Sequence, residues 1–202
     1  MSRKPAHNAD SLLDVAAGLA AAQGAGAVTM SAVAAAAGAP SGSVYYRFPD
    51  RAALLASLWL RTIDRFQSGY VAALHTDPPQ AAAVQAARHV VDWSLRNPTE
   101  AAVLLAGPES FGSAQWSAEA RAAAAARQAR LDDAVRNLGD RLGWRSQVDR
   151  ERLALLIIEL PYAAVRRCAR KPDADLARTA EAVDQMIRKV VGGGETPACG
   201  RG

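Results

Sequence analysis

The chain has 202 residues, of which half are hydrophobic but only 5% aromatic, and its 24 basic and 20 acidic side chains leave a formal net charge of +4. This length suits one large domain or two small ones, and the slight positive balance permits a polyanionic partner without requiring one. The longest apolar run, residues 153–165, is broken by Glu159 and Pro161. It falls short of the roughly 20 residues of a membrane span, so no membrane partner is expected.

The sequence shows no pattern of residues typical of catalysis or metal binding. Cys168 and Cys199 form no CxxC pair, and the three histidines, His7, His75 and His89, are scattered. Neither a disulfide framework nor a metal site is expected from such spacing. No phosphate loop, nucleophile motif or signal peptide is present. We therefore expect a cytoplasmic protein that is not an enzyme and holds no cofactor.

Alanine dominates the hydrophobic residues, and alanine favours helices and disfavours strands. The β-branched residues do not form alternating runs. The sequence predicts an all-α fold of about nine helices, with an N-terminal three-helix helix-turn-helix domain and a C-terminal helical domain.

Asn8 or Asp10 is expected to cap the first helix, which runs to about Gln23. A helix-turn-helix is predicted over residues 29–48. Thr29 caps its first helix, and Gly38 ends that helix because glycine adopts left-handed backbone angles readily. Pro40 suits the first turn of the next helix, because its missing N–H would be unpaired there in any case. This order of a helix, a tight turn with glycine and a second helix is typical of motifs whose second helix enters a DNA major groove.

Further helices follow after Asp50, which is expected to cap a long helix. The remaining helices are predicted at 51–74, 80–95, 99–106, 118–142, 148–170 and 173–191, with a loop at 107–117. The predicted domains are a DNA-binding domain at 1–50, a connecting helix at 51–76, a ligand-binding and dimerisation domain at 77–191, and a disordered tail at 192–202. Pro161 is expected to kink the helix that contains it.

The segment AVAAAAGAPSGSVYYRFPDRAALLASL closely resembles the DNA-binding domain of the TetR family of bacterial transcriptional regulators. The resemblance covers about residues 10–60. It implies a homodimer whose N-terminal domains bind a palindromic double-stranded DNA operator and whose C-terminal domain binds a small molecule. Ser31 and Ser41 depart from the pattern, which often has basic or long polar residues there. Residues 1–60 carry a net charge of only +1.

Ten residues in and around the helix-turn-helix are candidate DNA contacts. They are Thr29, Ser31, Pro40, Ser41, Gly42, Ser43, Tyr45, Tyr46, Arg47 and Arg51. Hydroxyls and backbone amides at a helix start bind phosphates or base edges, and a tyrosine ring can contact a thymine methyl group. The alternatives are helix capping by the serines, packing of the Tyr45 ring, and solvated helix ends for the arginines.

The candidate ligand contacts are large or charged groups in the otherwise alanine-rich C-terminal part. They are Trp93, Phe111, Trp116, Glu159, Tyr162 and Arg166. The aromatic residues either line a cavity for a largely apolar effector or fill the core. Glu159 lies in an apolar run, where an unpaired charge is costly, so it is expected to pair with Arg166, with Arg88 or with a ligand.

The last predicted helix carries one apolar stripe formed by Leu176, Ala180, Val183, Ile187 and Val190. Together with the apolar run at 153–165, this stripe predicts a homodimer joined through the last two helices. We expect a ligand-responsive regulator that represses transcription and is released by a small molecule. The alternatives are a helical protein-interaction module with a degenerate helix-turn-helix, and a small-molecule carrier or enzyme.

Overall fold

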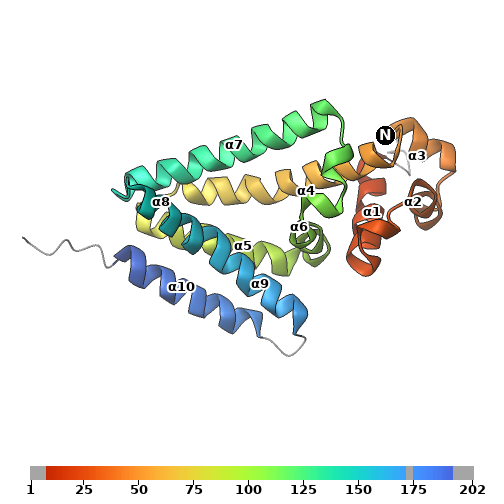
Figure 1. Ribbon diagram of the computed structural model, residues 1–202. Coiled ribbons are helices and arrows are strands. Elements are labelled where there is room, and N and C mark those ends of the chain that lie inside the picture. The colour runs from red at the N-terminus through yellow and green to blue at the C-terminus, as the bar shows by residue number, and fades with distance from the viewer. Residues whose placement is uncertain (1–7, 172–174, 193–202) are drawn as a thin grey trace, which may run out of the picture. The chain divides into compact units, whose positions relative to one another are not determined.

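A computed structural model describes residues 8–171 and 175–192 of the chain (Figure 1). The described residues form helices and turns without any strand, which confirms the predicted all-α class. The N-terminal helices are α1 (Ala9–Gln23), α2 (Met30–Ala37), α3 (Ser41–Arg47) and α4 (Arg51–Leu74). They are followed by α5 (Pro79–Arg96), α6 (Pro98–Ser110), α7 (Ala118–Arg141), α8 (Gln147–Ala154), α9 (Leu160–Arg170) and α10 (Leu176–Gly192).

These helices group into two compact units. Unit 1 contains the described residues up to Phe66 together with Asn97–Ala129, and unit 2 contains Gln67–Arg96 and the described residues from Arg130 onward. The helices α4 and α7 each continue from one unit into the other. The functional boundaries predicted at residues 50 and 76 remain predictions, and most of the predicted tail lies outside the described residues.

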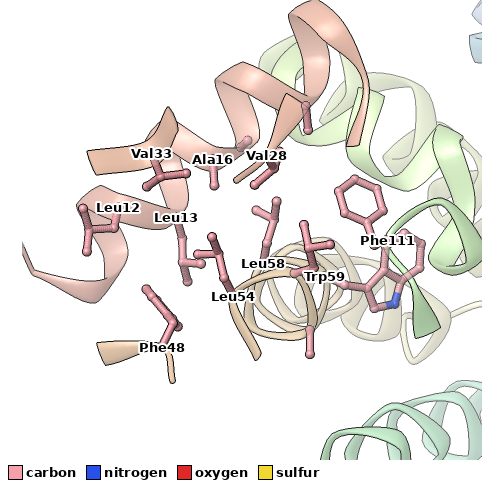
Figure 2. Close-up of a cluster of buried hydrophobic side chains, with 14 of the residues drawn as sticks. Leu12, Leu13, Ala16, Val28, Val33, Phe48, Leu54, Leu58, Trp59 and Phe111 are labelled. Atoms are coloured by element: carbon pink, nitrogen blue, oxygen red, sulfur yellow. The ribbon is translucent and has the colours of Figure 1, made fainter. Parts of the chain in front are cut away.

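The core of unit 1 holds the helix-turn-helix against α1 and the first half of α4 (Figure 2). Asn8 caps α1, since its side-chain oxygen accepts a hydrogen bond from the Ser11 amide at 2.7 Å. Leu12 of α1, Val33 of α2 and Leu54 of α4 are fully buried in this core. Burial of apolar side chains contributes about 25 cal/mol per Å² of area, so this cluster fixes the position of the short helices.

The segment between α6 and α7 differs from the loop predicted at 107–117. The structure continues α6 to Ser110 across a kink at Gly107, whose φ of 77° is left-handed. Pro108 then occupies the first turn of the helical segment after the kink, where a missing N–H costs nothing. A short 3₁₀ turn (η2, Ser113–Gln115) completes the connection.

Unit 2 is built around α5, α9 and α10, which pack against one another (Figure 1). Four alanines on α5 are fully buried and allow this close approach: Ala82, Ala83, Ala86 and Ala87.

The helix predicted at 148–170 is present, but it is interrupted by a change from α-helical to π-helical hydrogen bonding. A π-helical turn (η3, Leu155–Glu159) separates α8 from α9, and Pro161 lies in the first turn of α9. None of the described helices is long and apolar enough to cross a membrane.

Candidate nucleic-acid interface

The turn between α2 and α3 is set by capping groups at both ends of α2. The Thr29 hydroxyl oxygen accepts a hydrogen bond from the Ala32 amide at 3.1 Å and begins α2. Gly38 ends the helix in the left-handed conformation, with φ of 59°. The Ala39 amide then donates to the Ala34 carbonyl at 2.9 Å, which closes the turn. The predicted roles of Thr29 and Gly38 in folding are thereby confirmed.

The helix α3 has one buried face and one exposed face. Val44 is fully buried and Phe48, which follows α3, is 5% exposed. Tyr45 and Tyr46 are 55% and 88% exposed, so most of the Tyr46 ring has no packing role inside this chain. Ser41 and Gly42 are exposed as well, whereas Ser43 is half-buried. The anchoring of α3 by Val44 and Phe48 therefore presents hydroxyls and aromatic rings to solvent.

The cationic groups beside α3 are engaged with the protein backbone. Arg47 donates from Nη1 to the Ser43 carbonyl at 3.0 Å, and its guanidinium lies 6.0 Å from the centre of the Tyr46 ring. Arg51 donates from Nε to the Val28 carbonyl at 2.7 Å and from Nη2 to the Ala25 carbonyl at 2.8 Å. No local pattern around Arg51 indicated this bracing role. Its contact with a phosphate remains a prediction.

Thr29, Ser31 and Pro40 lie at the starts of the two helices of the motif. The hydroxyl oxygens of Thr29 and Ser31 are 3.2 Å apart, and Ser31 is exposed. Pro40 is the residue that immediately precedes α3, and it is exposed. The structure thus brings the predicted DNA-contact residues together around α2 and α3, and the individual contacts with DNA remain predictions.

Ion pairs join α4 to α1 and α6 within unit 1, a feature that sequence reasoning missed. Arg61 lies 2.8 Å from the Asp14 carboxylate of α1. Arg65 pairs with Asp14 at 3.5 Å and with Glu100 of α6 at 2.6 Å. The hydrogen bond to Glu100 raises the pKa of Arg65, so this guanidinium stays charged. These pairs connect α1, α4 and α6.

The candidate ligand residues Phe111 and Trp116 belong to the core of unit 1. Their rings lie 5.8 and 6.5 Å from the Trp59 ring, centre to centre, and the Trp116 indole donates to the Phe111 carbonyl at 2.9 Å. Figure 2 shows Phe111 in this core with Trp59. This arrangement corresponds to the core-filling alternative stated above. Trp93, by contrast, is a buried residue of α5 in unit 2.

Glu159, Tyr162 and Arg166 also lie in unit 2. Glu159 is exposed, so its charge does not carry the burial cost expected from the apolar run around it. Within the described ranges of the chain, neither Arg166 nor Arg88 forms an ion pair with Glu159; Arg88 pairs with Asp184 at 3.1 Å and with Asp92 at 3.6 Å. The Arg166 guanidinium lies 5.6 Å from the centre of the Tyr162 ring. A shared ligand-binding role for these residues remains a prediction.

Comparison with known proteins agrees with the geometry of the motif. Residues 12–58 match the family model for bacterial regulatory proteins of the tetR family. No curated protein matches the chain. Among solved structures, a tetR-family bacterial regulatory protein from Rhodococcus RHA1 is similar at 23% identity, with a TM-score of 0.70, covering 92% of this chain and 98% of that one.

Two similar structures are regulators named FadR. The fatty acid degradation regulator FadR from Bacillus halodurans shares 18% identity, with a TM-score of 0.70 over 96% of this chain and 99% of that one. FadR from Bacillus subtilis, solved in complex with stearoyl-CoA, shares 14% identity, with a TM-score of 0.69 over 89% of this chain and 97% of that one. Identities this low show the shared fold. The family model thus covers the helix-turn-helix part of the chain, residues 12–58, and the solved structures show that the chain shares the fold of TetR-family regulators.

Proposed function

We propose that the protein represses transcription by binding a palindromic operator as a homodimer, and that a small molecule releases it from the DNA. In this proposal residues 1–50 bind the DNA and residues 77–191 bind the effector and the second subunit. Residues 51–76 form the helix that connects these two parts. Each α3 enters the major groove of one half-site, and the two half-sites are about 34–36 Å apart, one helical turn.

The observation that supports this function best is the exposed face of α3. Tyr45 and Tyr46 are 55% and 88% exposed beside the fully buried Val44. Exposed aromatic rings on a short helix that is held rigidly by its other face are suited to contact phosphates through hydroxyls and thymine through apolar contact. Affinity then depends on hydroxyls, amides and dimer geometry more than on positive charge.

The effector is proposed to be largely apolar. The similar FadR from Bacillus subtilis was solved with stearoyl-CoA, a molecule with a long acyl chain. In this chain, Trp93 and Tyr162 are aromatic residues of unit 2, buried and half-buried, and Arg166 places a cation beside the Tyr162 ring. An effector changes operator binding only through its different affinities for the DNA-bound and released conformations.

A mobility-shift titration on the DNA upstream of the protein's own gene tests the function. The variant with Ser43, Tyr45 and Tyr46 all changed to Ala is expected to bind about a hundredfold more weakly, since each lost hydrogen bond is worth about 1 kcal/mol. The matched control changes Ser68 and His75 to Ala, because both are exposed and lie in the connecting segment 51–76. It is expected to bind like the wild type.

Two results separate this proposal from its rivals. Absence of sequence-preferring, salt-sensitive DNA binding by the wild type would favour the protein-interaction module. Wild-type affinity of the triple variant would contradict the assignment of α3 as the reading helix. Adding stearoyl-CoA to the preformed complex tests release, and failure of this step alone would reject that effector while leaving the DNA assignment intact.

A further inference from the structure

A hollow lies within unit 1, and the exposed tyrosines of α3 are not among its lining residues. It has a volume of about 480 Å³ and is lined by residues of Pro49–Leu60 and of Gln115–Ala123. One wall is therefore the first part of α4, and the other is η2 with the start of α7. Sites for small molecules commonly have volumes of about 300–1,000 Å³, so the hollow is large enough for one.

The walls of this hollow are mostly apolar and made of small side chains. Five alanines and Leu60 contribute, and among them Ala53 on α4 and Ala120 on α7 are half-buried. Methyl groups on both walls leave the space open, where longer side chains would fill it. An apolar ligand body can contact these walls without displacing any side chain of the core.

The charges around the hollow are negative. Asp50 and Glu119 line it and are exposed, and none of its lining residues is basic. The neighbouring guanidiniums are held elsewhere: Arg51 donates to the Val28 and Ala25 carbonyls, Arg121 donates to the Trp116 carbonyl, and Arg127 pairs with Asp64 at 2.6 Å. Among the described residues, no ion pair neutralises either lining carboxylate.

The partial positive charges at the helix N-termini beside the hollow offset only part of this negative charge. Both α4 and α7 begin there, and each N-terminus is equivalent to about +0.5 charge. Asp50 and Ser117 cap these ends by accepting hydrogen bonds from the Ala53 amide at 2.8 Å and the Ala120 amide at 3.1 Å. Two carboxylates against two half-charges leave a balance of about −1, which favours a cation.

We propose that this hollow binds a small amphipathic organic cation. The apolar body of the ligand packs on the alanines of α4 and α7, and its ammonium group lies beside Asp50 and Glu119. Pro49 and Asp50 join α3 to α4, so the bound cation contacts the link that directly follows the reading helix. This site is separate from the candidate effector residues Trp93, Tyr162 and Arg166.

Three probes with the same aromatic body test the site in the full chain: (2-naphthylmethyl)trimethylammonium, neutral 2-naphthylmethanol and anionic 2-naphthylmethanesulfonate. The cation is expected to bind most tightly and the anion most weakly, by calorimetry or naphthalene fluorescence. In ¹⁵N-labelled protein, the amide signals of Ala53, Ser57 and Ala120 are expected to shift with the cation. The assay needs no DNA, so its outcome is independent of the proposed repressor function.

The double variant Asp50→Asn and Glu119→Gln is expected to weaken binding of the cation about tenfold, because each exposed carboxylate contributes roughly 0.7 kcal/mol. Asn retains the side-chain oxygen that caps α4, so the fold is preserved. The matched control, Glu109→Gln with Glu151→Gln, removes two exposed charges elsewhere. Equal binding of the three probes, equal losses in both double variants, or amide shifts confined to unit 2 would each overturn the proposal.

Discussion

The hydroxyl of Tyr70 on α4 donates a hydrogen bond to the carbonyl oxygen of Ile157 at 2.8 Å, and both residues are fully buried. In a regular α-helix this carbonyl would accept from the N–H of the residue four positions later. That residue is Pro161, which has no N–H. The tyrosine therefore supplies the donor that the proline lacks, at the π-helical turn between α8 and α9.

Replacing Tyr70 with Phe removes only the hydroxyl and leaves the Ile157 carbonyl buried without this partner. The free energy of unfolding is expected to fall by about 1–3 kcal/mol, the cost of an unsatisfied buried polar group. Chemical denaturation followed by circular dichroism measures the loss. A loss below about 0.5 kcal/mol would show that another donor serves this carbonyl.

The substitution Pro161→Ala provides the matched control for Tyr70→Phe. Alanine restores an N–H that can donate to the Ile157 carbonyl, so removal of the Tyr70 hydroxyl should cost less in this background. The coupling free energy from the double-mutant cycle is expected to be about 1 kcal/mol. Strict additivity of the two substitutions would contradict the relationship between Tyr70 and Pro161.

Arg51 offers a separate test, because bracing of the protein and contact with DNA predict different results. A lysine at this position keeps the charge but cannot span the carbonyls of both Val28 and Ala25 as the guanidinium does. We expect Arg51→Lys to lower the free energy of unfolding by about 1–2 kcal/mol. Unchanged unfolding together with weaker operator binding would instead assign Arg51 to phosphate contact.

The helix-turn-helix was predictable because its determinants are local. Thr29 caps α2 through a residue three positions away, and Gly38 ends the same helix by its own backbone angles. Signals of this kind are contained in a few consecutive residues. The predicted bounds of α4, Arg51–Leu74, are likewise those of the structure, since Asp50 and the Asp77-Pro78 break mark them in the sequence.

Contacts between distant residues gave no such signal. The bracing bonds of Arg51 reach residues 23 and 26 positions away, and the bond from Tyr70 spans 87 positions. No periodicity or composition records these partners. For Phe111 and Trp116, the sequence did not distinguish packing in the core from lining a ligand cavity, because aromatic residues are suited to both roles.

The position of Phe111 in the core leads to a prediction about stability. Phe111 is 1% exposed and lies against Trp59. Phe111→Ala is expected to lower the free energy of unfolding by about 3–5 kcal/mol, through lost burial and a residual cavity. Phe111→Leu should cost much less because it keeps most of the volume. If Phe111→Ala kept wild-type stability while altering the response to an effector, Phe111 would instead line a ligand cavity.

Asp184 predicts a pH dependence in unit 2. Burial raises the pKa of its carboxyl above the ordinary value of 3.8, while Arg88 lowers that pKa, with smaller effects from Arg188, Asp92 and Glu181. The folded state therefore binds a proton more readily than the unfolded state. The contribution of Asp184 to the free energy of unfolding is therefore greatest below the pKa that this carboxyl has in the unfolded state. The contribution falls as pH rises through the pKa that the carboxyl has in the folded state.

Asp184→Asn cannot ionise, so its stability relative to the wild type should increase as pH rises from about 4 through this window. Urea denaturation at a series of pH values measures the difference, and the ¹³C signal of the carboxyl reports its pKa directly. Arg88→Met, which removes the attracting charge, should raise the pKa of Asp184 further. A pKa at or below 3.8 in this variant would show that burial is not the dominant cause.

The last helix gives a prediction about assembly. Val183 and Ile187 of α10 are buried within unit 2, whereas Met186 and Val190 are 44% and 39% exposed. Met186 and Val190 are four positions apart and therefore share a face of the helix. Exposed apolar residues on one helical face are suited to an interface between identical subunits, as we propose for the homodimer.

Met186→Glu with Val190→Glu is expected to convert a dimer into a monomer, because dimerisation would then bury four unpaired carboxylates near the two-fold axis. Sedimentation at several concentrations measures the change, and Ala122→Glu with Ala126→Glu is the control, since both alanines are exposed on α7 in unit 1. The monomeric variant should lose preference for a palindrome over a single half-site, because one α3 then reads the DNA alone. A variant that stays dimeric would place the interface elsewhere, and a monomeric wild type would remove the dimer from the mechanism.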